Sequence, residues 1–477
     1  MDRSLLGKAI AMSSPRTVKA SHQPPNISPA SFPVKKKSKL AAFTLPEPQQ
    51  TQSAAATTTP LSTWAVTSTH PNLKQRIQLQ ACNHSLIPLL NHERGASVTL
   101  LEGGGSGAIV IKIQPHESPC FVRKFMPNTR QGQGIKAIQK EPEWIMFMSQ
   151  QKTRSLNDDY DPDQLHALGP YFPTILQRGC LLTSPINTSG QLPTCSGFFY
   201  DMTFYNGPSL GQLMAGNQLT NTAIISKLDT LITTIKTAQH SISKQKIQLG
   251  SAERVSEFER LYIQRGWQRL SNKSSILNSR FDTGLRSVTV NSFLNLDQLS
   301  INGVNCQGIQ NLLGQVEKDE LLKWRLGVKE RGVNVHGDLT LSNIIYSKDF
   351  FLIDAKVDPN WIKTKTLPKT DTDYDMMKLL FSCYFTGVMN DSIVMKETAP
   401  LQFEFLCQEY NPEPLFNHLL QRIVPNDQPD SIDRRRALLF KVGYQFFADC
   451  TYRQSEKHVF LDLGIATYFL NKSLEYR

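Results

Sequence analysis

The sequence of 477 residues has no apolar run that approaches the length of a transmembrane helix, so stable membrane insertion is not expected. Its eight cysteines lack the paired spacing of a zinc site, and no internal repeat is visible. Most of the cysteines lie in apolar contexts (Cys82, Cys120, Cys180, Cys383, Cys407 and Cys450). Such contexts are typical of reduced core thiols, which predicts a cytosol-like compartment.

Acidic residues are scarce near the N-terminus. Within residues 1–80 only Asp2 and Glu47 oppose ten lysines and arginines, so this segment carries +8 of the net charge of +11 and leaves +3 for the rest of the chain. A high isoelectric point therefore does not indicate a basic surface on the folded part. We expect no nucleic-acid partner.

Residues 1–72 form a predicted disordered basic tail rich in Ser, Thr and Pro, with too little apolar periodicity to bury a core. The cluster from Lys35 to Lys39 could contact a protein or an anionic surface, or it could simply be solvated. The first twenty residues fit an organellar transit peptide, a bacterial secretion leader or an untargeted tail. A cytoplasmic location is expected, and import or secretion as an effector stays open.

The rest of the chain predicts an α+β protein with a strand-rich lobe over 73–206 and a mostly helical lobe over 207–477. Its hydrophobic content of 40% suffices for a substantial core. Residues 274–306 look like an insert with a turn at Asn302-Gly303. Helical patterns cover 221–244, 255–270, 312–331, 373–386, 399–410, 431–450 and 458–474.

The most informative stretch is a short loop, Val335 to Asn343, followed by an apolar run that ends in Asp354. Phosphoryl transfer from ATP needs a carboxylate to accept the proton of the attacking hydroxyl, and hard oxygen ligands to hold magnesium. Asp338 suits the first role. Asn343 and Asp354 suit the second, because a hairpin between them would bring both to one cleft.

The string His336-Gly337-Asp338, then Asn343 and Leu352-Ile353-Asp354, resembles the catalytic loop and metal-binding aspartate of the aminoglycoside phosphotransferase and choline kinase superfamily. That resemblance implies a protein-kinase-like fold with a small antiparallel β-rich lobe and a helical lobe. It also implies that ATP and Mg²⁺ are the cofactors, that His336 belongs to the catalytic loop, and that Asp375 hydrogen-bonds this loop. The resemblance covers roughly residues 97–475.

Three further strings resemble a branch of this superfamily found with bacterial capsule and surface-polysaccharide genes. They are Asn302-Gly303, Asp354-Ala355-Lys356-Val357-Asp358-Pro359 and Met376-Met377-Lys378-Leu379-Leu380-Phe381-Ser382.

The other half of such a site lies upstream. Two strands flank a glycine-rich turn that could lay backbone N–H groups over ATP phosphates, although such a turn can also be only a flexible hairpin (Gly103, Gly104, Gly105, Ser106 and Gly107). In the next strand Val122 and Lys124 share a face, which predicts an adenine contact and a phosphate ligand. Arg123 is expected to point outward.

A lysine in this role needs a carboxylate from a following helix, which the pattern places at 137–150. Glu143 is preferred over Glu141 because Pro142 suits a first turn and would leave Glu143 inside the helix. Further on, a strand leads to a hinge whose backbone would meet the adenine edge (Asp201, Met202 and Thr203).

The acceptor is expected to be a hydroxyl of a small molecule. A protein kinase would usually carry arginine where Gly337 stands, and a long peptide-binding segment after Asp354, but the helix led by Asp373 follows after only nineteen residues. The sequence thus predicts a phosphotransferase for a sugar or glycan precursor, with a polar pocket enclosed by 274–306 and the helices from Asp373 onward. The alternatives are a protein-directed kinase and a catalytically silent nucleotide-binding scaffold.

Overall fold

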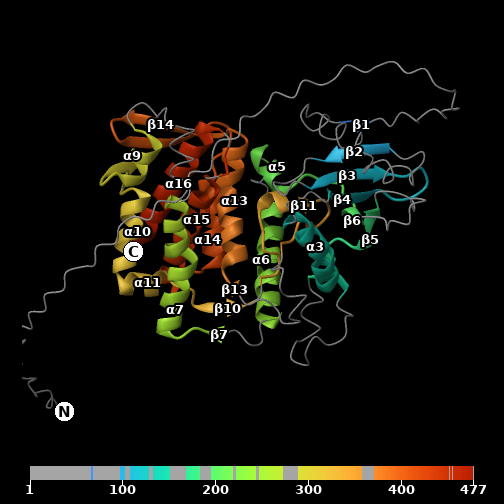
Figure 1. The fold of residues 1–477 in the computed structure, drawn as a ribbon, viewed down its shortest axis with the longest axis horizontal. Helices are drawn as coiled ribbons and strands as arrows, with labels where there is room; N and C mark the ends of the chain where they lie inside the picture. Colours follow the sequence, from blue (N-terminus) through green and yellow to red (C-terminus); the bar gives the residue numbers. More distant parts are fainter. Residues whose placement is uncertain are drawn as a thin grey trace, which may run out of the picture. The chain divides into compact units, whose positions relative to one another are not determined.

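The computed structural model describes residues 66–67, 97–101, 108–127, 133–150, 168–182, 195–216, 218, 222–242, 247–271, 288–332, 334–356, 370–450, 452–453 and 455–475. Residues 63–477 form one compact unit by their contacts. Within this unit an antiparallel sheet is followed by a largely helical part, so the fold is α+β as the sequence predicts (Figure 1).

The first sheet has six strands in the order β1-β2-β3-β4-β6-β5, antiparallel except where β1 runs parallel to β2. The expectation of a disordered tail through residue 72 differs from the structure at Val66 and Thr67, which pair with Val98 and Thr99 at the edge of the sheet. Both are β-branched residues that suit a strand. The strands are β1 (Val66–Thr67), β2 (Ser97–Leu101), β3 (Ile109–Gln114), β4 (Phe121–Pro127), β5 (Ile175–Leu182) and β6 (Cys195–Thr203).

The two faces of this sheet bury different residues because side chains alternate along a strand. One face holds a small apolar cluster that includes Ile111, Ile113 and Phe121. On the other face Val122 joins the main core, and Lys124, two residues on, is also buried. The predicted shared face of Val122 and Lys124 is therefore confirmed.

Helix α3 (Gln133–Gln150) packs against strands β4, β5 and β6. It begins a full turn before the predicted start, so Pro142 lies in the helix interior rather than in the first turn. The inward face follows helical spacing through Glu141, Trp144, Ile145 and Met148, all of which are buried. Trp144 Nε1 donates a hydrogen bond of 2.8 Å to the carbonyl of Val335, which ties α3 to the loop before His336.

The C-terminal part is built on α13, α15 and α16, whose residues are mostly buried and which contact one another (Figure 1). No helix among the described residues is both long and apolar enough to cross a membrane. The longer helices here include α6 (Thr222–Ile242), α7 (Ser251–Phe258), α10 (Ile309–Lys318), α13 (Tyr374–Met389), α14 (Glu413–Ile423), α15 (Ser431–Cys450) and α16 (Glu456–Glu475). After α7 a π-helical turn, Glu259–Ile263, leads into a further α-helix over 264–271. Short ones are α5 (Leu210–Ala215), α9 (Val290–Asn295) and α11 (Glu320–Leu326).

A second sheet, in the order β14-β15-β8-β9, shows where the predicted helices fail. The predicted helix over 399–410 is wrong, because Phe403 and Phe405 alternate with polar residues and form the inner face of strand β15. The predicted helix over 312–331 also ends early, since 330–332 is a strand. The predicted turn at Asn302-Gly303 is confirmed, with φ of 49° and 75°. The strands are β8 (Leu299–Ile301), β9 (Val304–Cys306), β14 (Ile393–Ala399) and β15 (Gln402–Cys407).

Short strands frame the loop at 335–343. β11 (Ile344–Tyr346) and β12 (Phe350–Leu352) pair as the predicted hairpin, with Ile344 opposite Leu352. This pairing brings Ile353, which follows the hairpin, back beside Asn343, which precedes it. The N–H of Ile353 donates a hydrogen bond of 2.9 Å to the carbonyl of Asn343. Three further strands form a separate small sheet: β7 (Ile247–Gln248), β10 (Glu330–Gly332) and β13 (Thr370–Asp371).

Candidate active site

The loop that carries Asp338 is fixed by one buried carboxylate at the start of α13. Asp375 accepts hydrogen bonds from the backbone N–H groups of Val335, His336 and Gly337, at 2.8, 3.0 and 2.7 Å. Three consecutive N–H donors on one fully buried carboxylate leave the loop little freedom. The expected hydrogen bonding by Asp375 is confirmed.

Gly337 is required by the same loop. Its φ is 73°, and a Cβ placed there would lie 1.7 Å from the carbonyl oxygen of Lys356. That close approach accompanies the bond from Lys356 N to the His336 carbonyl (2.8 Å). Any larger side chain would push the loop away from the segment that follows Asp354.

His336 is fully buried and holds the loop rather than facing a substrate. Its Nε2 lies 2.9 Å from the carbonyl of Ile353, which can only accept, so Nε2 carries the proton. Its Nδ1 then accepts from the N–H of Asp338 at 3.2 Å. Burial holds the pKa of His336 below its ordinary value, in keeping with a neutral ring. These two hydrogen bonds suit a part in holding the loop, and the catalytic role predicted for His336 stays a prediction.

Asp338 lies at the tip of the loop with both carboxylate oxygens in contact with lysines. Lys356 Nζ bonds Oδ2, and Lys378 Nζ on α13 lies 3.2 Å from Oδ1. Burial alone would raise the pKa of Asp338, but the two ammonium groups outweigh it and hold the pKa below its ordinary value. Asp338 is therefore ionised at neutral pH, as an acceptor of a hydroxyl proton must be.

No role was predicted for these two lysines from the sequence. A signal for Lys378 exists, because it lies three residues after Asp375 on a predicted helix and so shares its face.

Lys124 joins the sheet to the segment after β12. Its Nζ lies 2.8 Å from Oε2 of Glu141 and also bonds Oδ1 of Asp354. Burial would lower the pKa of Lys124, but Glu141 and Asp354 hold it above the ordinary lysine value. The ammonium is thus charged in a buried place where it meets the residue expected to bind metal.

Glu143 does not meet Lys124, and that prediction is wrong. Its carboxylate pairs instead with Arg178 Nη1 at 2.9 Å, and the two side chains are partly exposed, Glu143 to 35% and Arg178 to 48%. The reason is the earlier start of α3, which turns Glu141 toward the sheet and Glu143 away from it.

Asp354 has a backbone conformation that non-glycine residues seldom adopt, with φ of 60°. Asn343 is anchored nearby, its Nδ2 donating to the carbonyl of Asp338 at 2.9 Å. That bond leaves the amide oxygen of Asn343 as its possible cation ligand. Among the described residues no cluster of three or more His, Cys, Asp or Glu could hold a metal by itself. An amide oxygen and one carboxylate do, however, match the oxygen ligands of a magnesium ion that also binds phosphates.

The glycine-rich turn, Gly103 to Gly107, lies outside the described residues. The strands on either side of it pair antiparallel, with Leu101 opposite Val110. A hairpin at this place is therefore present as predicted, while its contact with phosphates stays a prediction.

Strand β6 carries the predicted hinge residues and corrects the predicted outward direction of Arg123. This strand lies between β4 and β5, and the N–H of Thr203 donates to the carbonyl of Thr174 at 3.0 Å. The backbone from Asp201 to Thr203 is therefore the end of a strand of the sheet, and its contact with adenine stays a prediction. Asp201 is buried opposite Arg123 on the neighbouring strand. Arg123 is 4% exposed, and its Nε forms an ion pair with Oδ1 of Asp201 at 2.7 Å.

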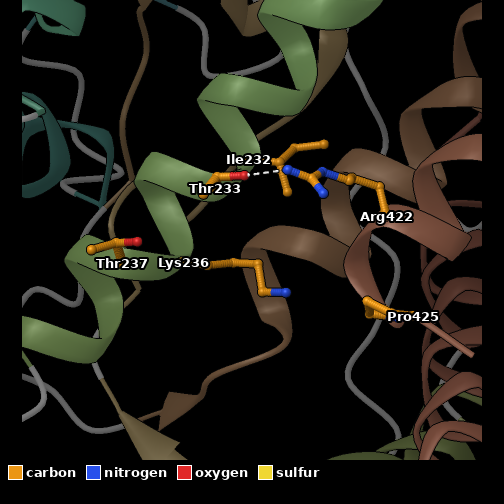
Figure 2. A pocket seen from close by; sticks show the side chains of 6 residues that line it. All are labelled: Ile232, Thr233, Lys236, Thr237, Arg422 and Pro425. Atoms are coloured by element: carbon orange, nitrogen blue, oxygen red, sulfur yellow. Dashed lines mark hydrogen bonds between the residues drawn. The ribbon is translucent and has the colours of Figure 1, made fainter. Parts of the chain in front are cut away.

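A cavity of about 390 Å³ lies between α6 and α14, apart from these residues (Figure 2). Its cations serve the packing of the two helices: Arg422 donates to Thr233 Oγ1 at 2.8 Å, and Lys236 donates to the carbonyl of Ile423 at 3.1 Å. No predicted site residue lines it.

The chain matches no protein-family model and no curated protein. Its fold resembles a glucosamine kinase in complex with glucosamine, ADP and inorganic phosphate, at 11% identity over 82% of this chain and 84% of that one, with a TM-score of 0.41. It also resembles thermostable mutants of an aminoglycoside phosphotransferase in ternary complexes with hygromycin B. The complex with ADP is 9% identical over 80% of this chain and 97% of that one, with a TM-score of 0.39. The complex with AMP-PNP is 12% identical over 81% and 97%, with a TM-score of 0.42. Such low values transfer no ligand to this chain.

Proposed function

We propose that the protein is an ATP- and magnesium-dependent phosphotransferase that phosphorylates a hydroxyl of a small molecule, a sugar or glycan precursor. The observation that carries this proposal is the meeting of Lys124, from the sheet, with Asp354, beside the loop that holds Asp338. Phosphoryl transfer needs a cation, a metal-binding oxygen and a base in one place. Residues far apart in the sequence supply all three.

Asp338 acts as the base. The acceptor oxygen forms a bond to the γ-phosphorus of ATP, its O–H bond breaks, and the proton passes to Asp338. The bond between the γ-phosphorus and the bridging oxygen breaks, and ADP leaves with that oxygen. An ionised carboxylate at a loop tip fixed by Asp375 suits this role, since orientation rather than covalent chemistry dominates phosphoryl transfer.

Lys124 binds phosphate oxygens, and Glu141 holds Lys124 in place. Val122, two residues before Lys124 on the same face, packs against adenine, and Gly103 to Gly107 cover the phosphates. We place the adenine edge at the backbone from Asp201 to Thr203, at the end of β6.

Asn343 and Asp354 would hold magnesium, which neutralises charge on the phosphates when bound. The amide oxygen of Asn343 and the carboxylate of Asp354 are both hard ligands. The cost of the unusual φ of Asp354, on the order of 1–3 kcal/mol, is typical of residues held for function.

The acceptor pocket remains a proposal drawn from the short spacing after Asp354. Of the predicted insert, β8 pairs with β15 and β9 packs against α16, while residues 274–287 lie outside the described residues. The resemblance to the capsule-associated branch favours a sugar. The buried thiols of Cys306, Cys383 and Cys450 fit a reducing, cytoplasmic compartment, and the basic tail could bind a protein or an anionic surface.

The test is ATP consumption by the purified chain with magnesium, measured against sugars, aminoglycosides, choline and generic peptides. Transfer of labelled phosphate to carbohydrates supports the proposal. Transfer to peptides alone would favour a protein-directed kinase, and nucleotide binding without transfer to any acceptor would favour the silent scaffold.

A further inference from the structure

Asp338 is held by two lysines that differ sharply in their surroundings. The side chain of Lys378 is 12% exposed and reaches Oδ1 from α13, whereas that of Lys356 is 58% exposed and reaches Oδ2 from the segment after Asp354. Neither ammonium contacts Glu141, the partner of Lys124. The two oxygens of the proposed base are thus covered by groups of unequal mobility.

Lys378 is fixed where it lies. Its ammonium lies 5.4 Å from the centroid of the Phe381 ring, and Asp449 adds a favourable charge nearby. Burial would lower the pKa of Lys378, but Asp338 and its neighbours hold the pKa above its ordinary value. Withdrawing this ammonium from its carboxylate would leave two poorly solvated charges unpaired, so Oδ1 stays covered.

Lys356 can leave Oδ2 more easily than Lys378 can leave Oδ1. Its side chain is 58% exposed, so the ammonium can be hydrated as it moves away, whereas the side chain of Lys378 is 12% exposed. The backbone of Lys356 stays in place when the side chain moves, because the N–H bonds the His336 carbonyl. An acceptor hydroxyl can therefore reach Oδ2 but not Oδ1.

We propose that Lys378 is a positioning residue of the phosphotransfer site, which fixes Oδ1 of Asp338 and so presents Oδ2 to the acceptor hydroxyl. This role rests on the proposed function. During transfer the acceptor proton moves to Oδ2 while its oxygen takes the γ-phosphoryl group and ADP leaves. Lys378 keeps its charge throughout and contacts neither the acceptor nor ATP.

The test compares Lys378→Met with Lys356→Met, which removes an ammonium from the other oxygen of the same carboxylate. The probes are magnesium-ATP with the best acceptor of the screen and, separately, magnesium-ATP hydrolysis with water as acceptor. Lys378→Met should lower kcat roughly ten- to a hundredfold, because a displaced base loses its alignment. Its KM for ATP should stay within about twofold, because Lys378 does not contact ATP and its loss leaves the ground-state binding of ATP unchanged. Lys356→Met should lower kcat clearly less than Lys378→Met does, because a solvent-exposed ammonium that must leave Oδ2 for the acceptor fixes the carboxylate less than a buried one.

Folding is checked by the melting temperature and by calorimetric binding of magnesium-ADP, both of which should be retained. Lys378→Arg keeps the charge and the donor and should recover part of the lost kcat. If Lys378→Met turns over like the wild type, or if Lys356→Met loses as much kcat as Lys378→Met, the positioning role is overturned. If Lys378→Met does not fold, Lys378→Arg takes its place in the test. An arginine variant that folds but has no kcat above background also overturns the positioning role. A wild-type chain that consumes no ATP would overturn the proposed function, and the role of Lys378 with it.

Discussion

At the scale of single residues, the candidate site is a set of carboxylates that lysines keep charged and in place, two of them largely buried (Lys124 and Lys378) and one exposed (Lys356). Asp338 and Asp354 both have a pKa below the ordinary value, because nearby ammonium groups outweigh their burial. They differ in what holds them. Asp338 is held by Lys378 and Lys356, and Asp354 by Lys124. This difference separates their expected roles and makes the two separable by mutation.

Asp338→Asn should lower turnover by roughly two to four orders of magnitude, because the amide cannot accept the acceptor proton. Magnesium-ADP binding and the melting temperature should change little. Steady-state kinetics and calorimetry measure both. Turnover equal to that of the wild type would remove Asp338 from the mechanism.

Asp354→Ala provides the contrast at the metal-binding position. It removes a hard oxygen ligand and should weaken ATP binding in the presence of magnesium. It should have far less effect on binding measured in EDTA. An affinity for magnesium-ATP equal to that of the wild type would contradict the assignment of Asp354 to metal.

The two glutamates of α3 offer a matched pair. Glu141→Gln removes one of the two carboxylates on Lys124 and should lower kcat/KM for ATP roughly ten- to a hundredfold by misplacing the ammonium. Glu143→Gln breaks only the exposed pair with Arg178 and should change kcat/KM by at most a few-fold, consistent with about 0–1 kcal/mol. A larger loss for Glu143→Gln would restore the original assignment.

At the scale of elements, the helices of the C-terminal part hold the loop through α13, so their packing matters to the site. Gly443 on α15 faces α16 so closely that an added Cβ would lie 2.8 Å from Leu470 N and 2.9 Å from the Ala466 carbonyl. Gly314 on α10 is different, because the nearest atom to its Cβ would be Trp267 Cζ2 at 4.0 Å. The same substitution should therefore have opposite effects at the two positions.

Gly443→Ala should lower the free energy of unfolding by about 1–3 kcal/mol, since backbone atoms cannot move aside as a flexible side chain can. Gly314→Ala should raise it by about 0.5–1 kcal/mol, because glycine loses more chain entropy in a helix. Urea unfolding of both variants measures the two changes. A neutral Gly443→Ala would show that α15 and α16 can separate at no cost.

The strand β15 shows why local patterns mislead at this scale. Residues 399–410 contain apolar residues at spacings that fit a helix, and the structure pairs Gln402–Cys407 with β14 and β8 instead. The pairing partner β8 lies about a hundred residues earlier in the sequence. Such partners are set by tertiary contacts and cannot be read from a local window.

At the scale of the whole molecule, most of the net positive charge, +8 of +11, lies in residues 1–80, before the part that holds the candidate site. The compact unit begins near residue 63, and β1 lies between that point and Leu73. These two start points define a test of what the tail contributes.

A chain that begins at Thr63 should unfold at nearly the temperature of the full chain and keep its catalysis, because residues 1–62 are predicted to bury little. A chain that begins at Leu73 also loses the pairing of Val66 and Thr67 with β2. It should lose no more than about 1–2 kcal/mol of unfolding free energy, the value of a few edge hydrogen bonds. Calorimetric scans measure both, and a large drop for the first chain would show that the tail docks on the catalytic part.

The sequence by itself determined the loop from His336 to Asn343, the hairpin that leads to Asp354, and the shared face of Val122 and Lys124. These features depend on residues close in the sequence, on turn chemistry and on the two-residue period of strands, all of which are local. Only the tertiary structure decided that Glu141 rather than Glu143 meets Lys124, that Arg123 is buried against Asp201, and that Lys356 and Lys378 cover Asp338. Each of these depends on the start of a helix or on the meeting of distant segments, where burial of charge selects one partner among several that the sequence allows.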